Sequence, residues 1–346
     1  MHAITARRRL IVVGALTGIC ALSPTAAMAE WGPGGSNGGQ KQENKREGQT
    51  LSSRITFKGG TKGSGGDAGS MQPVGDWAPP ACWYEPYSAA EFAKDTETGY
   101  DMVTKDPQQP NYARRSVSEF RDIYKDGKYK NYNKDKADEG SWWVAQQDPD
   151  RWMEDAAQAC DRQPFWAENG EPVDDPNAVD PEMLAELAYN KVRLPDTEVT
   201  LAPEGETKVN LPTWAWLDKA KFKKVSVTAA LNAQGVNIEA TTTAEPVSLK
   251  LEPGTKDAQT YPASGECALN DDGSIGEPYA KGKSDENPPC GLKYLRSSGD
   301  ATFPMKATVT WKVTWTGTGV PGGTLPSGTF DNEQNITVQE IQSINR

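Results

Sequence analysis

The sequence predicts an α+β protein in two parts, a small disulfide-tied and mainly helical domain followed by an antiparallel β-sandwich. Three observations favour this organisation. Apolar residues recur at helical spacing within 76–196, and they alternate along most segments from residue 197 onward. The cysteines that remain after the N-terminal segment are even in number, which is typical of a disulfide framework in an exported chain.

Residues 1–29 have the three parts of a secretory signal peptide. Arg7, Arg8 and Arg9 precede the apolar stretch 10–22, and Ala-Met-Ala at 27–29 is a small-residue cleavage site. We expect the mature chain to begin at Glu30 and to be secreted, with association with the cell wall as an alternative. The arginine run also loosely resembles a twin-arginine signal, so the choice between Sec and twin-arginine export stays open. No later window approaches the ~20 apolar residues of a membrane helix, which predicts no stable membrane span in the mature chain.

Charge and histidine content restrict the chemistry. Cleavage would remove three arginines and no acids, which takes the formal charge from −11 to −14. A surface this acidic repels phosphates, so we expect no nucleic-acid partner. The single histidine, His2, would leave with the signal, which excludes His-dependent nucleophilic triads and His-containing zinc sites. With no nucleotide-binding motif either, the sequence predicts no enzyme activity, no cofactor and no metal.

The mature chain begins with a Gly/Ser-rich leader, residues 30–75, whose composition predicts a flexible tether with one short strand at 51–57. The aromatic-rich domain 76–196 follows. Four helices are expected in it: one after the capping box Ser88/Glu91, one after Ser116, one over 150–160, and one after Asp180 with Pro181 at its first position.

The third part, residues 197–346, has the pattern of short strands separated by Gly and Pro turns. Strands are expected at 197–201 and 207–211 as one hairpin, at 225–231 and 236–244 as another, and at 247–251, 307–316 and 335–344. In the segment 307–316, Val309, Trp311, Val313 and Trp315 share one face, which predicts a core strand. The set indicates a sandwich of immunoglobulin type.

Four cysteines remain in the mature chain, and they allow three pairings. We favour Cys82–Cys160 with Cys267–Cys290, because each bridge then stays inside one predicted domain.

Several stretches of 180–346 resemble a family of secreted actinobacterial proteins that have no assigned function. The resemblance is carried by Pro-Glu-Met-Leu-Ala-Glu-Leu-Ala at 181–188, Val-Asn-Leu-Pro-Thr-Trp-Ala-Trp-Leu at 209–217, Cys-Gly-Leu-Lys-Tyr at 290–294 and Thr-Trp-Lys-Val-Thr-Trp at 310–315. It implies a C-terminal β-sandwich similar to the polycystic-kidney-disease (PKD) repeat.

Two sets of residues are candidate binding sites. Trp214 and Trp216 would point the same way on a strand, and would form an aromatic platform for sugar rings or an apolar partner; the alternative is that they fill the seam between the two domains. The stretch 114–136 is rich in Lys and Arg, and Arg114, Arg115, Lys125 and Tyr129 could contact an anionic polymer; the alternative is a solvated helix surface.

The acidic turn 270–274 could hold Ca²⁺, although Asp-Gly is above all a turn signal.

From these features we expect an exported, non-enzymatic binding or scaffold protein that uses its β-sandwich at the cell envelope or in the medium. Its partner would be a cell-envelope polymer or another exported protein. One alternative is a secreted, carboxylate-dependent hydrolase of cell-wall glycan. Another is an accessory of a larger exported assembly that docks through the aromatic region.

Overall fold

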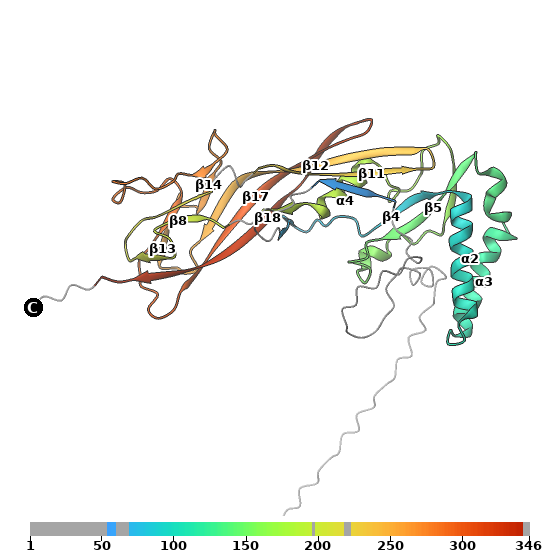
Figure 1. Ribbon diagram of the computed structural model, residues 1–346, viewed down its shortest axis with the longest axis horizontal. Helices are drawn as coiled ribbons and strands as arrows, with labels where there is room; N and C mark the ends of the chain where they lie inside the picture. The colour runs from blue at the N-terminus through green and yellow to red at the C-terminus, as the bar shows by residue number, and fades with distance from the viewer. Residues whose placement is uncertain (1–53, 60–68, 196–197, 218–222, 342–346) are drawn as a thin grey trace, which may run out of the picture.

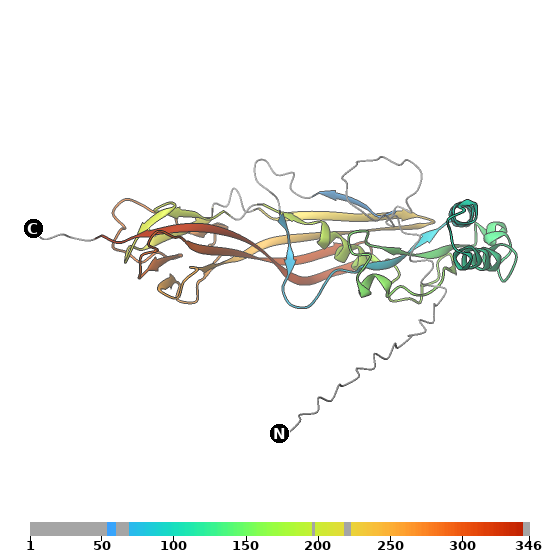
Figure 2. The same cartoon turned by 90° about the horizontal axis from the view of Figure 1, so that it is seen from below.

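The computed structural model describes residues 54–59, 69–195, 198–217 and 223–341. The predicted signal peptide and leader residues 30–53 and 60–68 lie outside the described residues. The molecule is elongated (Figures 1 and 2). A long antiparallel sheet runs along its middle, helices α2 (Ala89–Lys105) and α3 (Asn111–Lys125) cross one end, and short strands gather at the other.

The large sheet has the strand order β1-β11-β12-β17-β18-β3, with β14 added to β12 and β9 to β18. Its strands are β1 (Thr56–Gly59), β3 (Gln72–Pro73), β9 (Glu206–Lys208), β11 (Val225–Ala233), β12 (Val236–Glu252), β14 (Glu266–Ala268), β17 (Phe303–Gly317) and β18 (Val320–Gln339). β17 alternates between buried and more exposed residues, so one face of the sheet is the core face.

A five-stranded sheet lies at the end away from α2 and α3, with the order β13-β16-β10-β15 and β8 beside β10. Its strands are β8 (Thr200–Ala202), β10 (Thr213–Leu217), β13 (Ala258–Tyr261), β15 (Ile275–Gly276) and β16 (Gly291–Tyr294). Ala215, Leu217 and Leu292 from this sheet lie in the same hydrophobic core as Leu249 and Val309 from the large sheet. The described chain is therefore mostly antiparallel sheet with few helices.

Residues 76–195 combine helices with a three-stranded sheet. The sheet contains β4 (Cys82–Tyr87), β5 (Gly140–Gln147) and β6 (Phe165–Glu168), and the two-residue strands β2 (Gly69–Ser70) and β7 (Arg193–Leu194) pair with each other. Helix α4 (Pro181–Lys191) begins as predicted, because Asp180 Oδ1 accepts a hydrogen bond from the Met183 amide at 2.7 Å. Thr242 on β12 donates to the Ala185 carbonyl at 2.7 Å, which joins α4 to the large sheet.

A separate aromatic cluster explains the aromatic content of 76–180. Phe92, Phe120, Tyr124, Tyr132 and Trp142 are all buried in it. Tyr132 lies in the short helical segment η1 (Asn131–Lys136), where three consecutive non-glycine residues, 131–133, have φ of 45°, 61° and 57°. This left-handed turn is held by the Tyr132 carbonyl, which accepts from Trp142 Nε1 at 2.8 Å, and by the Tyr132 hydroxyl, which donates to Glu97.

Several predicted elements are confirmed: the capping box of α2, the helix after Asp180, the hairpin β11–β12 and the core strand β17. Others are wrong. Ser116 lies inside α3, which begins at Asn111 instead. The segment 150–160 contains turns and the short 3₁₀ helix η2 (Asp155–Gln158). The expected hairpin 197–211 does not form, because β8 pairs with β10 and β9 pairs in parallel with β18.

Two pieces of the predicted leader belong to the fold. β1 pairs with β11 along four residues, and β3 pairs with β18. Helix α4, which was assigned to the helical domain, packs against β11 and β12. The large sheet therefore takes edge strands from the predicted leader and is covered by a helix from the predicted helical domain.

Candidate functional site

The two candidate tryptophans lie on β10, and they point away from the large core. Alternate residues of a strand face opposite sides, and Ala215 and Leu217 are the β10 residues in that core. Trp214 belongs to neither hydrophobic cluster, although it is only 2% exposed. Trp216 is partly exposed on the same face. The burial of Trp214 must therefore come from chain that covers the outer face of the five-stranded sheet.

The strand neighbours of these tryptophans are small. Ala202 and Gly291 stand opposite Trp214, and Thr200 and Gly276 stand opposite Trp216. Residues directly opposite one another on neighbouring strands share a face of the sheet. Because the side chains of these four neighbours are short, none of them covers an indole ring. A Cβ at Gly291 would lie 2.2 Å from the Thr213 carbonyl oxygen and 2.7 Å from Pro288 Cγ, so only glycine fits there.

Residues 277–289, which we call the cover loop, bury Trp214. Lys283 Nζ lies 5.1 Å from the centroid of the Trp214 ring, and the Tyr279 ring makes a T-shaped contact with that ring at a centroid distance of 5.9 Å. The loop starts after Gly276, which pairs with Trp216, and ends at Cys290. Trp214 Nε1 is buried and has no hydrogen-bond partner among the described residues. The site thus consists of two indoles on a sheet face, one beneath a polar loop.

This arrangement differs from both sequence interpretations of the pair. Trp214 is not an open platform, because the cover loop lies on it. It also does not fill a seam with helices α2 and α3, which lie at the opposite end of the molecule (Figure 1). Trp311 and Trp315 are in the core, where the alternation of β17 placed them. Sequence reasoning missed Lys283 and Tyr279; the only signal was their position inside the Cys267–Cys290 segment.

The basic stretch is largely occupied by structural contacts. Lys125 Nζ and Arg121 Nε bind the two carboxylate oxygens of Glu97 at 2.7 and 2.8 Å, and join α3 to α2. Arg114 Nη2 donates to the Asp106 carbonyl at 2.7 Å, and the Tyr129 ring stacks on Tyr124.

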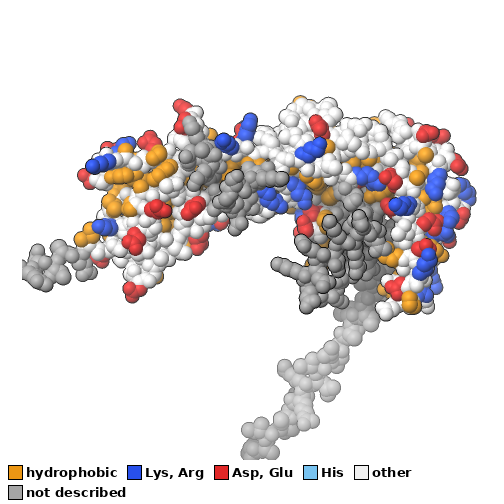
Figure 3. All heavy atoms as spheres, viewed as in Figure 1, with side chains coloured by type: hydrophobic (Ala, Val, Ile, Leu, Met, Phe, Trp, Pro, Cys, Tyr) orange, Lys and Arg blue, Asp and Glu red, His pale blue; other side chains and the backbone are white. Residues whose placement is uncertain are grey.

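Of the four predicted contact residues in this stretch, Arg115 is the one with an exposed side chain. Basic and acidic side chains lie side by side over the helical end in Figure 3. This distribution corresponds to the solvated, mixed-charge surface that was the alternative interpretation.

The acidic segment 270–274 forms a tight hairpin turn. The Gly273 amide donates to the Asn270 carbonyl, and the Ser274 hydroxyl donates to Asp272 Oδ1 at 2.6 Å. Gly273 has φ of 84°, which explains the Asp-Gly pair as turn chemistry. Within the described ranges, no group of three or more His, Cys, Asp or Glu is arranged to hold a metal ion.

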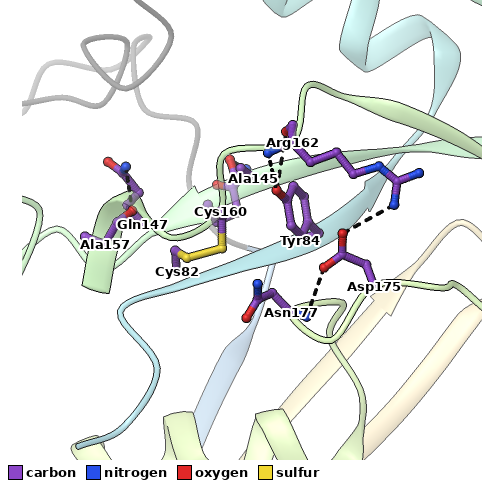
Figure 4. Close-up of a disulfide and its surroundings, with 10 residues drawn as sticks. Cys82, Tyr84, Ala145, Gln147, Ala157, Cys160, Arg162, Asp175 and Asn177 are labelled. Carbon is purple, nitrogen blue, oxygen red and sulfur yellow. Dashed lines mark hydrogen bonds and ion pairs between the residues drawn. A yellow bond between two sulfur atoms is a disulfide. The ribbon is translucent and has the colours of Figure 1, made fainter. Parts of the chain in front are cut away.

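Both predicted disulfides are present, Cys82–Cys160 and Cys267–Cys290. Around the first bridge, the Tyr84 hydroxyl accepts from the Arg162 amide at 2.9 Å, and Arg162 forms an ion pair with Asp175 at 3.3 Å (Figure 4). A depression of about 470 Å³ lies beside β6. It is lined by Phe165, Trp166 and the carboxylates Glu168, Glu171 and Asp174, all three of which are exposed.

Among the described helices, none is long and apolar enough to cross a membrane. Comparison with known proteins finds no match, whether with protein-family models, curated proteins or solved structures. The resemblance to an actinobacterial family of secreted proteins therefore stays a prediction, and the function has to be argued from the site.

Proposed function

We propose that this chain is an exported, non-enzymatic binding or scaffold protein that holds a cell-envelope polymer or another exported protein through the tryptophan-bearing face of its β-rich end. The two disulfides are consistent with an extracellular location. We infer that the two sheets that share one core form a sandwich of immunoglobulin or PKD type, downstream of a cleaved signal peptide.

One observation carries the proposal: two adjacent tryptophans face outward from a sheet whose other face is the core. Large aromatic side chains dominate binding energetics where they occur at interfaces, and Trp216 is partly exposed on this face. The elongated shape suits the same role (Figure 2), because the long strands β12, β17 and β18 hold this end far from the helical end.

The hydrolase alternative has less support. A carboxylate-dependent glycosidase needs a general acid whose pKa is raised by a desolvated environment, facing a second carboxylate across the substrate. The three carboxylates of the depression beside β6 are exposed. Glu186 does have a raised pKa, but it lies on α4, and α4 packs on the large sheet rather than lining that depression.

A pull-down tests the proposal. The mature chain from Glu30 is immobilised and exposed to culture medium and to an envelope fraction at physiological salt. We expect one polymer or protein to be retained, and we expect the double variant Trp214→Leu/Trp216→Leu to lose it. Trp152→Leu is the matched control, because Trp152 is an exposed tryptophan on the segment 150–160. Retention that survives the double variant would contradict the proposed face, and turnover of wall glycan by the wild type would favour the hydrolase.

A further inference from the structure

We propose that the cover loop, residues 277–289, is a movable cover over Trp214, and that Trp214, once uncovered, and the partly exposed Trp216 beside it bind the pyranose rings of an envelope glycan. This inference rests on the proposed binding function and names its ligand class. It concerns the outer face of β10, which carries Trp214 and Trp216.

The cover loop is attached firmly only at its ends. It is fixed at Gly276 by pairing with β10 and at Cys290 by the bridge to Cys267. Between these points, the backbone hydrogen bonds recorded among the described residues stay inside the loop, from Lys283 to Ala280 and from Glu286 to Lys283. Nearly all of its residues are exposed; Pro288 is buried and Lys283 is partly buried. Segments with few buried contacts and local hydrogen bonding open at low cost in free energy.

The contacts that hold the loop over Trp214 are of a type that a bound ligand can also make. Lys283 makes a cation–π contact with the indole and also an ion pair with Glu277 at 3.6 Å. Tyr279 makes a T-shaped ring contact with the indole although it is 40% exposed. The Lys283 ammonium presents an electron-poor surface to the π face of Trp214. The C–H bonds on one face of a pyranose ring present a similar surface, so a sugar ring can take the place of the cover.

The unpaired indole nitrogen favours a ligand that carries oxygen acceptors. A buried N–H without a partner is costly, and Trp214 Nε1 finds no acceptor within the part of the chain that the structure describes while the loop lies on it. A sugar stacked on the ring can offer a hydroxyl or acetamido oxygen to this donor.

Trp216 provides a second stacking position. Two residues along a strand correspond to about 6.6 Å, comparable to the length of one sugar unit in a β-linked chain. The strand neighbours of both indoles are Ala202, Gly291, Thr200 and Gly276, which are short enough to let a ring reach the sheet. Consecutive rings of one glycan strand would then stack on the two indoles.

Calorimetric titration with a β-1,4-linked N-acetylglucosamine hexamer tests the inference on the mature chain. The uncovered variant Tyr279→Ala/Lys283→Ala removes the two contacts with the indole, and we expect it to bind the hexamer about fivefold more tightly than the wild type. Tyr112→Ala/Lys128→Ala is the matched control, because it removes the same side chains from exposed positions at the helical end and should leave affinity unchanged.

Two changes at Trp214 in the uncovered background identify the site. Trp214→Leu should abolish binding, and Trp214→Phe should retain weakened binding, because a ring remains but the N–H donor is lost. Circular dichroism and thermal unfolding confirm that each variant is folded; if Trp214→Leu does not fold, the Phe variant and Trp216→Leu carry the test.

Unchanged affinity in the uncovered variant, or binding that is independent of Trp214, would overturn the inference. A partner retained by the wild type in the pull-down together with no sugar binding by the uncovered variant would overturn the glycan ligand alone. Failure of both experiments would remove the proposed function as well.

Discussion

The guanidinium of Arg54 lies over the ring of Tyr87, with its Cζ atom 3.4 Å from the ring centroid. Arg54 also forms an ion pair with Glu91 at 3.3 Å, and its backbone amide donates to Glu85 Oε2 at 3.0 Å. Residue 54 lies two positions before β1 and Glu91 lies in the first turn of α2, so this contact joins the edge of the large sheet to the helical end. Burial raises the pKa of the Tyr87 hydroxyl to about 12, although Arg54 acts in the opposite direction.

We predict that Arg54→Ala lowers the free energy of unfolding by about 1–2 kcal/mol, since it removes a partly buried cation–π contact and an ion pair together. Arg54→Met keeps the aliphatic packing on Tyr87 and should lose less. Urea unfolding of the two variants measures the difference. Equal losses would show that the charge of Arg54 contributes all of the effect.

Glu97 supports the contact between α2 and α3 in a pH-dependent way. Burial by itself would raise the pKa of Glu97, but hydrogen bonds from Arg121, Lys125 and Tyr132 lower it to about 2. A carboxyl whose folded pKa lies below its unfolded value of 4.5 stabilises the folded state above pH 4.5, and this contribution is lost as the pH falls toward 2.

Glu97→Gln should therefore cost about 1 kcal/mol at pH 7, a value reduced by solvent screening because the side chain is partly exposed. The difference from wild type should shrink between pH 4.5 and 2. Denaturant unfolding at several pH values checks this, with the exposed Glu119→Gln on α3 as control. A difference that stays constant with pH would contradict the prediction.

The pKa of Glu186 on α4 is shifted in the opposite direction from that of Glu97. Burial raises its pKa to about 7, and the nearby charges of Glu182 and Asp180 add to the effect. Because the folded state then binds a proton more strongly than the unfolded state, the chain loses stability as the pH rises from 4.5 to 7.

We expect Glu186→Gln to stabilise the protein at pH 8 by about 1–3 kcal/mol, and to have little effect at pH 4. Thermal unfolding at the two pH values measures it. Glu204→Gln, in an exposed turn, provides the control. A variant less stable than wild type at pH 8 would show that the Glu186 carboxylate has a favourable partner.

The two disulfides should contribute unequally. Cys82–Cys160 closes a segment with a sequence separation of 78, and Cys267–Cys290 closes one of 23. On the loop-entropy estimate, replacing both cysteines of a pair by alanine costs about 4–5 kcal/mol for the longer segment and about 3 kcal/mol for the shorter one. Urea unfolding of the two double variants gives the comparison, and non-reducing peptide mapping checks the pairing. A linked Cys160–Cys267 peptide would be incompatible with the structure.

Features that depend on neighbouring residues could be predicted from the sequence. Asp180 with Pro181, and Ser88 with Glu91, determine where α4 and α2 begin, because capping involves backbone groups within three residues. The alternation Val309-Trp311-Val313 determined the core face of β17 for the same local reason. The disulfide pairing followed from the sequence order of the predicted domains.

Features that depend on distant partners could not be predicted. β9 pairs with β18, whose residues follow it by more than a hundred positions, so the local turn signal at 203–206 gave a wrong hairpin. Ser116 and Glu119 have the spacing of a capping box, but the helix that contains them, α3, begins five residues earlier, at Asn111. Its position is set by packing beside α2, which is a tertiary contact. Trp214 and Trp216 were found by their spacing on a strand. Which face of the sheet they occupy, and that residues 277–289 lie on Trp214, was decided by tertiary structure alone, since a strand's two faces become different only when another sheet covers one of them.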